Sequence, residues 1–121
     1  LAIVEAKTAE LCACCCELGA HYAGTDERTV GRLAAFGRYL GIAFQIADDV
    51  LNVTGTREEL GKNPNTDAER GKKTYPTFYG TEGASKLADD CVARAIGRLD
   101  SFGPSADALR GIARYITARK N

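Results

Sequence analysis

The sequence contains no methionine, no apolar run long enough to cross a membrane and no excess of charge of either sign. A gene product starts with methionine, so we expect a chain that opens at Leu1 and has none to be a piece of something larger. Spanning a bilayer takes roughly 20 consecutive apolar residues, and no signal peptide is recognisable. The formal net charge of +0 argues against nucleic acid as the main partner. Together these absences predict a soluble, cytoplasmic protein.

Strand-like alternation of apolar and polar residues is missing as well, and no segment repeats. With 121 residues, 45% of them apolar, the chain can bury a core. The pattern is helical throughout and predicts an all-α bundle in which residues 1–121 are part of a single domain, without a second one. We expect helices at 1–22, at about 25–53, at 82–101 and from about 105 onward, with a helical turn between Pro76 and Gly80.

Apolar spacing predicts the inward faces of these helices. On the first helix this face comprises Val4, Leu11, Cys15, Leu18 and Tyr22, before a break at Gly24. On the last two it comprises Leu87, Cys91, Val92, Ala95, Leu99, Leu109, Ile112, Ala113 and Ile116. Thr25 is the expected cap of the second helix, because its hydroxyl can accept a hydrogen bond from a first-turn amide. Gly37 and Gly41 lie on one face, where a neighbouring helix or a ligand can approach the backbone.

Four of the five cysteines, Cys12, Cys14, Cys15 and Cys16, lie close together on the first helix, and Cys91 is far downstream. A disulfide framework requires spaced cysteines in an oxidising compartment. Cys12 and Cys15 have the spacing of a zinc pair, but the chain has a single histidine and no second pair. We therefore interpret the cysteines as small buried apolar residues in a reduced protein, with metal binding as the less favoured alternative.

The most informative segment runs from Phe44 to Asn52. It places two adjacent carboxylates, Asp48 and Asp49, on an otherwise apolar helix, where they form a narrow polar stripe with Gln45 and Asn52. Ionised carboxylates inside a bundle must become protonated, pair with bases or hold a cation. Adjacent aspartates offer the oxygen ligands that suit Mg²⁺, so the stripe predicts a magnesium site.

A long polar connection over residues 54–74 follows the stripe and carries Arg57, Lys62, Arg70, Lys72 and Lys73. Loops of this length are usually functional or disordered. Folded back over the acids, these bases would balance a phosphate-rich ligand bridged by metal; the alternative is a solvated charged loop. Lys7, on the face predicted to be inward, either extends to the rim or meets an anion in a cavity.

Several motifs occur in a fixed order along the chain. They are Lys7-Thr8, Phe44-Gln45 with Asp48-Asp49, Gly61-Lys62 with Asp67, and Gly71-Lys72 before Thr74-Tyr75-Pro76. In this order, and with its Tyr-Ile-Thr-Ala-Arg-Lys ending, the sequence resembles the C-terminal half of the trans-isoprenyl diphosphate synthases, the polyprenyl synthetase family. The resemblance implies an antiparallel helix bundle of the isoprenoid synthase type around a deep cavity, normally a homodimer. The implied reaction is the Mg²⁺-dependent condensation of isopentenyl diphosphate with an allylic diphosphate.

The resemblance also implies roles for individual residues. In this family two aspartate-rich motifs hold Mg²⁺ on the allylic diphosphate, and the ions and nearby lysines stabilise the departing pyrophosphate. By position, Asp48 and Asp49 belong to the second motif, with Asp48 the direct ligand and Asn52 a weaker one. The implied catalytic residues are Asp48, Asp49 and Lys62, and the implied diphosphate-binding residues are Lys7, Thr8, Gln45, Lys62 and Lys72. Asp67 is expected to order the loop.

Two departures keep alternatives open. Asn52 stands where the motif usually has a third aspartate, and the first aspartate-rich motif and the isopentenyl diphosphate pocket have no counterpart in these 121 residues. We therefore expect the chain to be inactive alone. The main alternative is a non-catalytic partner subunit of a prenyl diphosphate synthase, which Asn52 slightly favours and the retained lysines and aspartates disfavour. A helical interaction module and a terpene cyclase of similar fold are less favoured.

Overall fold

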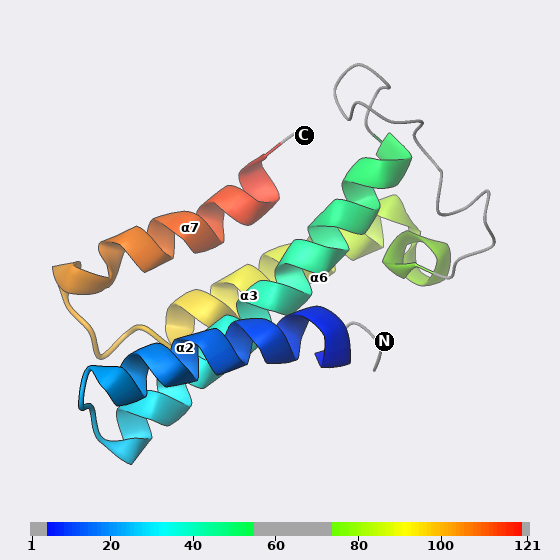
Figure 1. Cartoon of the computed structure of the whole chain (residues 1–121). Helices are drawn as coiled ribbons and strands as arrows, with labels where there is room; N and C mark the ends of the chain where they lie inside the picture. The colour runs from blue at the N-terminus through cyan, green and yellow to red at the C-terminus, as the bar shows by residue number, and fades with distance from the viewer. Residues whose placement is uncertain (1–4, 55–73, 120–121) are drawn as a thin grey trace.

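The structure, a computed structural model, describes residues 5–54 and 74–119. Within these ranges the chain is helical and has no strand, which confirms the all-α prediction. The elements are the π-helix η1 (Glu5–Ala9), α2 (Glu10–Tyr22), α3 (Glu27–Thr54), α6 (Tyr75–Gly97), the 3₁₀-helix η2 (Pro104–Ala106) and α7 (Asp107–Ala118) (Figure 1). No helix in the described ranges is both long and apolar enough to cross a membrane.

The long helix α3 is the centre of the bundle. It packs against η1 and α2 on one side and against α6 and α7 on the other, and successive helices run antiparallel (Figure 1). The larger core cluster joins α3, α6 and α7 around Phe36, Val92, Leu99 and Ile116, and a smaller one joins Ile46 to Tyr75 at the start of α6. Burial of these apolar side chains is the main force that holds the helices together.

Two glycines of α3 set the distance to α2. A Cβ placed on Gly37 would lie 2.5 Å from the carbonyl oxygen of Cys12 and 2.9 Å from the Sγ of Cys16. A Cβ on Gly41 would lie 2.7 Å from the Cα of Ala9. The prediction that this face of α3 admits a neighbouring backbone is therefore confirmed.

This close approach also corrects the predicted inward face of the first helix. Small residues, Ala9, Ala13 and Ala20, are the ones that are buried against α3. Leu11, Leu18 and Tyr22 are 64%, 51% and 91% exposed, Cys15 is exposed as well, and Val4 lies outside the described residues. The physical reason is that two backbones this close leave no room for large side chains between them.

The turn from α2 to α3 confirms one prediction and corrects another. Gly24 has φ +75°, a left-handed conformation that favours glycine, and it ends the first helix as expected. The predicted cap, Thr25, instead donates its hydroxyl to the carbonyl of Ala20 at 3.1 Å. Asp26 takes the capping role, since its Oδ1 accepts a hydrogen bond from the Thr29 amide at 2.8 Å.

The structure joins the predicted helical turn before Gly80 and the helix predicted from 82 into one kinked helix, α6, which begins at Tyr75, and α7 begins at Asp107, close to the predicted 105. Thr74 and Thr77 form a reciprocal cap at the start of α6, and Gly80, with φ +73°, kinks the helix after its first turns. The helix ends at Gly97 rather than at 101. On α7, Ala113 and Ile116 are buried, but Ile112 is 52% exposed, so the prediction for Ile112 is wrong.

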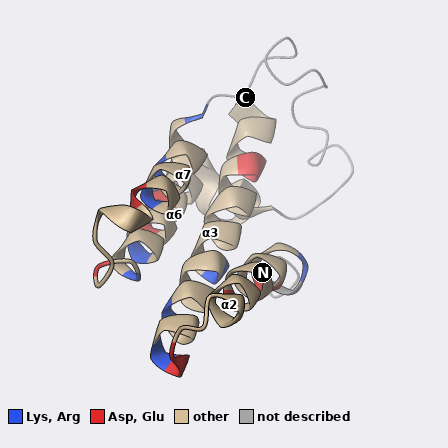
Figure 2. Ribbon diagram, turned by 60° about the vertical axis from the view of Figure 1, so that its left-hand side comes forward, with Lys and Arg blue, Asp and Glu red and all other residues tan. Residues whose placement is uncertain are grey.

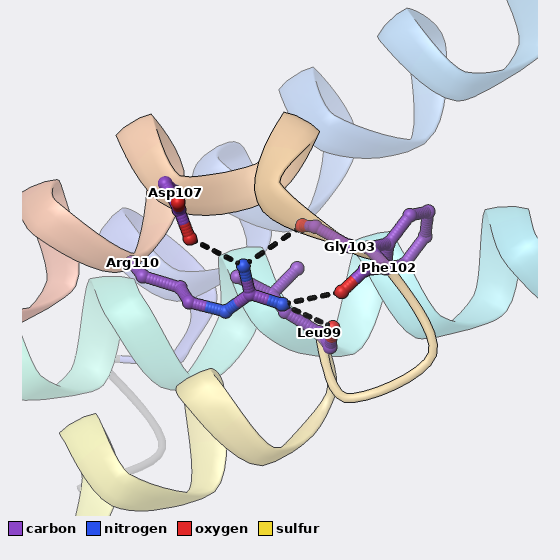
Figure 3. A network of polar contacts seen from close by, with 5 residues as sticks. All are labelled: Leu99, Phe102, Gly103, Asp107 and Arg110. Atoms are coloured by element: carbon purple, nitrogen blue, oxygen red, sulfur yellow. Dashed lines mark hydrogen bonds and ion pairs between the residues drawn. The ribbon is translucent and has the colours of Figure 1, made fainter.

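Arg110 ties the beginning of α7 to the end of α6 (Figure 3). Its Nη2 donates to the carbonyl oxygens of Leu99 at 2.9 Å and Phe102 at 2.6 Å. Its Nη1 donates to the carbonyl oxygen of Gly103 at 3.0 Å and to Asp107 at 2.8 Å. One guanidinium therefore makes charge-assisted hydrogen bonds to three carbonyls of the segment that connects α6 to η2 and α7.

Candidate active site

The polar stripe predicted from the sequence lies on the second half of α3. Between Arg38 and the end of this helix, Asp48 and Asp49 are the only charged residues. Figure 2 shows this acidic position as an isolated red segment on an uncharged stretch of helix. The structure therefore confirms that the pair sits on an otherwise apolar helix, and it assigns the two carboxylates different surroundings.

Asp49 points into the bundle. It is 7% exposed, and its Oδ1 accepts a hydrogen bond from Nε2 of Gln45 at 2.9 Å. Asn52, one turn further, is 4% exposed, and its Oδ1 accepts no hydrogen bond from the described part of the chain. Three members of the stripe thus lie between helices, and one of them offers a buried oxygen without a partner.

Asp48 occupies the open side of the stripe. Its side chain is 46% exposed, and its Oδ1 lies 3.0 Å from Nη2 of Arg119, the residue that follows α7. The Arg119 guanidinium carbon lies 4.6 Å from the centroid of the Phe44 ring, which is within the range of a cation–π contact. No local sequence pattern predicts this contact of Arg119, although the residue lies in the C-terminal segment that contributes to the family resemblance.

The first motif, Lys7-Thr8, lies on η1. A π-helix is uncommon and often marks a functional site. Lys7 is exposed rather than interior, and Thr8 is half-buried. The carbonyl of Thr8 would lie 3.1 Å from a Cβ on Gly41, one turn before Gln45, so the fold brings the first motif beside the helix that carries the second.

The remaining predicted site residues, Lys62, Asp67 and Lys72, lie outside the described residues, as do Arg57, Arg70 and Lys73. Their proposed contacts with a diphosphate therefore stay predictions.

The oxygen donors of the stripe fit Mg²⁺ as part of a larger ligand set. No group of three or more His, Cys, Asp or Glu side chains gathers within residues 5–54 and 74–119, so these residues alone do not enclose an ion. Mg²⁺ is commonly held by one or two carboxylates together with substrate phosphates. The open carboxylate of Asp48 fits that role, and the unpartnered oxygen of Asn52 is a further donor of the right type.

The cysteines contribute no cluster of this kind. All five are free thiols; Cys14 and Cys15 are exposed, and Cys12, Cys16 and Cys91 are half-buried. The interpretation as buried apolar residues is therefore wrong for Cys14 and Cys15, because both lie on the side of α2 that faces away from α3. Burial raises the pKa of Cys12, Cys16 and Cys91.

Comparison with known proteins identifies the class. The family model of the polyprenyl synthetases matches residues 1–103. The chain is 39% identical over 116 residues to geranylgeranyl pyrophosphate synthase 9 of Arabidopsis thaliana, covering 95% of this chain and 32% of that protein. It is 42% identical over 117 residues to heptaprenyl diphosphate synthase component 2 of Geobacillus stearothermophilus, covering 97% and 33%.

Solved structures agree. A polyprenyl synthase from Caulobacter crescentus, in complex with calcium and isoprenyl diphosphate, superposes with a TM-score of 0.91 at 29% identity and covers 98% of this chain and 48% of that one. The chain belongs to the polyprenyl synthetase family and has its antiparallel, all-α isoprenoid synthase fold. It spans about a third of the length of the curated relatives described above.

Proposed function

We propose that this chain supplies the second aspartate-rich half of the active site of a Mg²⁺-dependent trans-prenyltransferase. The reaction condenses isopentenyl diphosphate with an allylic diphosphate to give a longer trans-polyprenyl diphosphate. The observation that supports it most is the open carboxylate of Asp48, 46% exposed, on a stretch of helix that is otherwise apolar. The names of the relatives, and the cation and isoprenyl diphosphate in the Caulobacter complex, point to the same class of substrate.

In this proposal, different residues of the chain bind the metal and the diphosphate. Asp48 presents an oxygen ligand on the open side of α3, and Gln45 holds the neighbouring Asp49 through the 2.9 Å hydrogen bond. Lys7, Thr8, Lys62 and Lys72 bind the diphosphate oxygens in this proposal, and their ammonium and hydroxyl groups donate hydrogen bonds to them. Bound Mg²⁺ would supply the charge that stabilises the departing pyrophosphate.

The proposal leaves the chain inactive alone. The sequence contains no Asp-Asp-x-x-Asp, and only Asp48 of the described stripe offers an open carboxylate. Metal-assisted diphosphate departure needs ligands on both sides of the leaving group, and the first aspartate-rich motif would provide the others. We also propose that the protein acts in the cytoplasm, as the sequence composition suggests, and that it is a homodimer, as the family resemblance implies.

A non-catalytic partner subunit is the second candidate. Asn52 favours it, since this residue is 4% exposed and lies one turn from the buried Asp49. A neutral amide there avoids placing a second carboxylate in the core, which benefits the fold, but it also removes a metal ligand. An intact first aspartate-rich motif in the complete gene product would argue for the enzyme.

The deciding experiment is an assay of the complete gene product. It uses isopentenyl diphosphate and a short allylic diphosphate, with and without Mg²⁺, and the products are sized. We expect Mg²⁺-dependent elongation, and we expect Asp48→Ala and Lys62→Ala each to lose most of the rate. Asp90→Ala is the matched control, because Asp90 also belongs to a pair of adjacent aspartates but is exposed on α6.

Near-wild-type rates in both Asp48→Ala and Lys62→Ala would contradict the site assignment. No turnover with any primer would favour the partner subunit. In that case, a rise in the rate of an active synthase on mixing would identify the chain as a modulator.

A further inference from the structure

The C-terminal end of α7 is held against α3 through Arg119. Its Nη2 lies 3.0 Å from the Oδ1 of Asp48 and 3.5 Å from the carbonyl oxygen of Phe44, and its Nε donates to the carbonyl of Ile116 at 3.2 Å. The side chain of Arg119 is 12% exposed, whereas that of Asp48 is 46% exposed. The arginine is thus held on several sides, and the carboxylate keeps an open face.

Asp48 is also the carboxylate to which the proposed function assigns Mg²⁺. A guanidinium in contact with this group repels a divalent cation that approaches the same oxygens, and the repulsion is stronger at a partly buried site than in water. The ion pair and the metal contact therefore compete for one side chain. In the structure, the Arg119 guanidinium is paired with the Asp48 carboxylate at 3.0 Å.

We propose that Arg119 is a positioning residue that occupies Asp48 in the metal-free state and is displaced when Mg²⁺ and a diphosphate bind. This inference rests on the proposed function. The Arg119–Asp48 contact holds the last turn of α7 against α3. Metal binding at Asp48 would break this contact and would therefore loosen the last turn of α7.

A cavity beside the pair gives the displaced side chain a place to go. Its volume is about 110 Å³, and its lining includes Arg119, Thr117 from α7 and Asp89 from α6. Asp89 lines the same cavity and is exposed, so its carboxylate is a second acidic group with which the guanidinium can pair after it leaves Asp48. The exchange would then replace one ion pair by another rather than leave Arg119 without a partner.

The test uses the complete gene product, in which the first aspartate-rich motif supplies the other ligands, with Mn²⁺ as the probe, alone and with inorganic diphosphate, and reads paramagnetic broadening of backbone amides by NMR. We expect broadening centred on Asp48. Arg119→Gln should bind Mn²⁺ about three- to tenfold more tightly, because the substitution removes the half-exposed ion pair that competes with the metal for Asp48. Arg114→Gln is the matched control: it makes the same charge change on the same helix, and Arg114 is exposed. It should leave the affinity unchanged.

A second readout needs no metal. In the metal-free chain, amide hydrogen exchange in the last turn of α7 should rise to the same extent in Arg119→Gln and Asp48→Asn, and no further in the double variant. Unchanged exchange in Arg119→Gln would show that the pair does not hold α7, and would overturn the proposal. Circular dichroism of each variant verifies that the helices are intact.

The outcomes separate this inference from the proposed function. Equal or weaker Mn²⁺ binding by Arg119→Gln, with loss of binding in Asp48→Asn, overturns the competition and leaves the metal site standing. Equal Mn²⁺ binding by the wild-type chain and Asp48→Asn removes Asp48 as a ligand, and the proposed function fails with it. Tighter binding by Arg119→Gln alone supports both.

Discussion

Gln45 donates a hydrogen bond from its Nε2 to the Oδ1 of Asp49, 2.9 Å away and one turn later on α3. Asp48, the neighbour of Asp49 in the sequence, has a different partner, so the two adjacent carboxylates have different surroundings. Asp49 is 7% exposed and held within the helix bundle, whereas the Asp48 side chain is 46% exposed and contacts Arg119 across two helices. Substitution of Asp48 and substitution of Asp49 are therefore expected to change the stability of the chain by different amounts.

The first prediction concerns stability. Asp49→Ala removes a buried carboxylate that accepts a hydrogen bond from the half-buried Gln45 amide, so it should lower the free energy of unfolding by about 1–3 kcal/mol. Asp48→Ala breaks a half-exposed ion pair, so it should cost about 0–1 kcal/mol. Urea denaturation of the 121-residue chain, followed by circular dichroism at the helix band, measures both. Asp49→Asn keeps an oxygen that Gln45 can donate to and should recover part of the loss.

Equal destabilisation by Asp48→Ala and Asp49→Ala would contradict the difference in burial. Full stability in Asp49→Ala would show that the hydrogen bond from Gln45 contributes nothing to the fold.

The second prediction concerns the contact of α2 with α3. Gly37→Ala places a methyl group 2.5 Å from the Cys12 carbonyl oxygen, so the two helices must separate, at a cost of about 1–3 kcal/mol or more. Gly31→Ala is the matched control on the same helix, where the added Cβ meets nothing within 4 Å. It should stabilise the chain by about 0.5–1 kcal/mol, because alanine favours a helix over glycine.

Thermal denaturation of the two alanine variants beside the wild-type chain gives the comparison. A melting temperature of Gly37→Ala at or above that of Gly31→Ala would show that the backbones do not approach as described.

The third prediction concerns the corner between α6 and α7. Arg110→Gln loses charge-assisted hydrogen bonds to the carbonyls of Leu99, Phe102 and Gly103, so it should destabilise the chain by about 1.5–3 kcal/mol. Arg110→Lys keeps the charge but not the planar set of donors, and should recover only a minor part. Arg114→Gln removes the same charge from an exposed position and should have little effect. Similar melting curves for Arg110→Gln and Arg114→Gln would contradict the proposal that the Arg110 hydrogen bonds stabilise this corner.

The sequence predicts the parts of this molecule that local rules determine. The helical class follows from apolar spacing, and glycine marks the break after the first helix at Gly24 and the end of the helical turn at Gly80, where the structure has a positive φ in both cases. The pair of glycines at 37 and 41 correctly indicates a close helix contact. The polar stripe is likewise visible in the sequence, because a helix places residues three and four apart on one side.

What the sequence does not show depends on how the helices pack. Leu11 and Leu18 form an apolar stripe, but the contact through Gly37 buries the alanines of α2 instead. Arg119 meets Asp48 across 71 residues, and this pairing exists only because α7 packs back along α3. The different burial of Asp48 and Asp49 depends on the same packing, which no local pattern encodes.

The last prediction concerns the thiols. Burial raises the pKa of Cys12, Cys16 and Cys91, so at pH 7.5 each carries less of the reactive thiolate than an ordinary cysteine, and each is also less accessible. Iodoacetamide should therefore modify the exposed Cys14 and Cys15 first, and mass spectrometry of the digested chain over time resolves the order. Because the raised pKa favours the neutral thiol in the folded chain, stability from this source is fully present below the thiol pKa of the unfolded chain, about 8.5. It is lost as the pH rises from there through the higher pKa of the folded chain. Modification of Cys12 as fast as Cys14 would show that α2 does not rest on α3 through that residue.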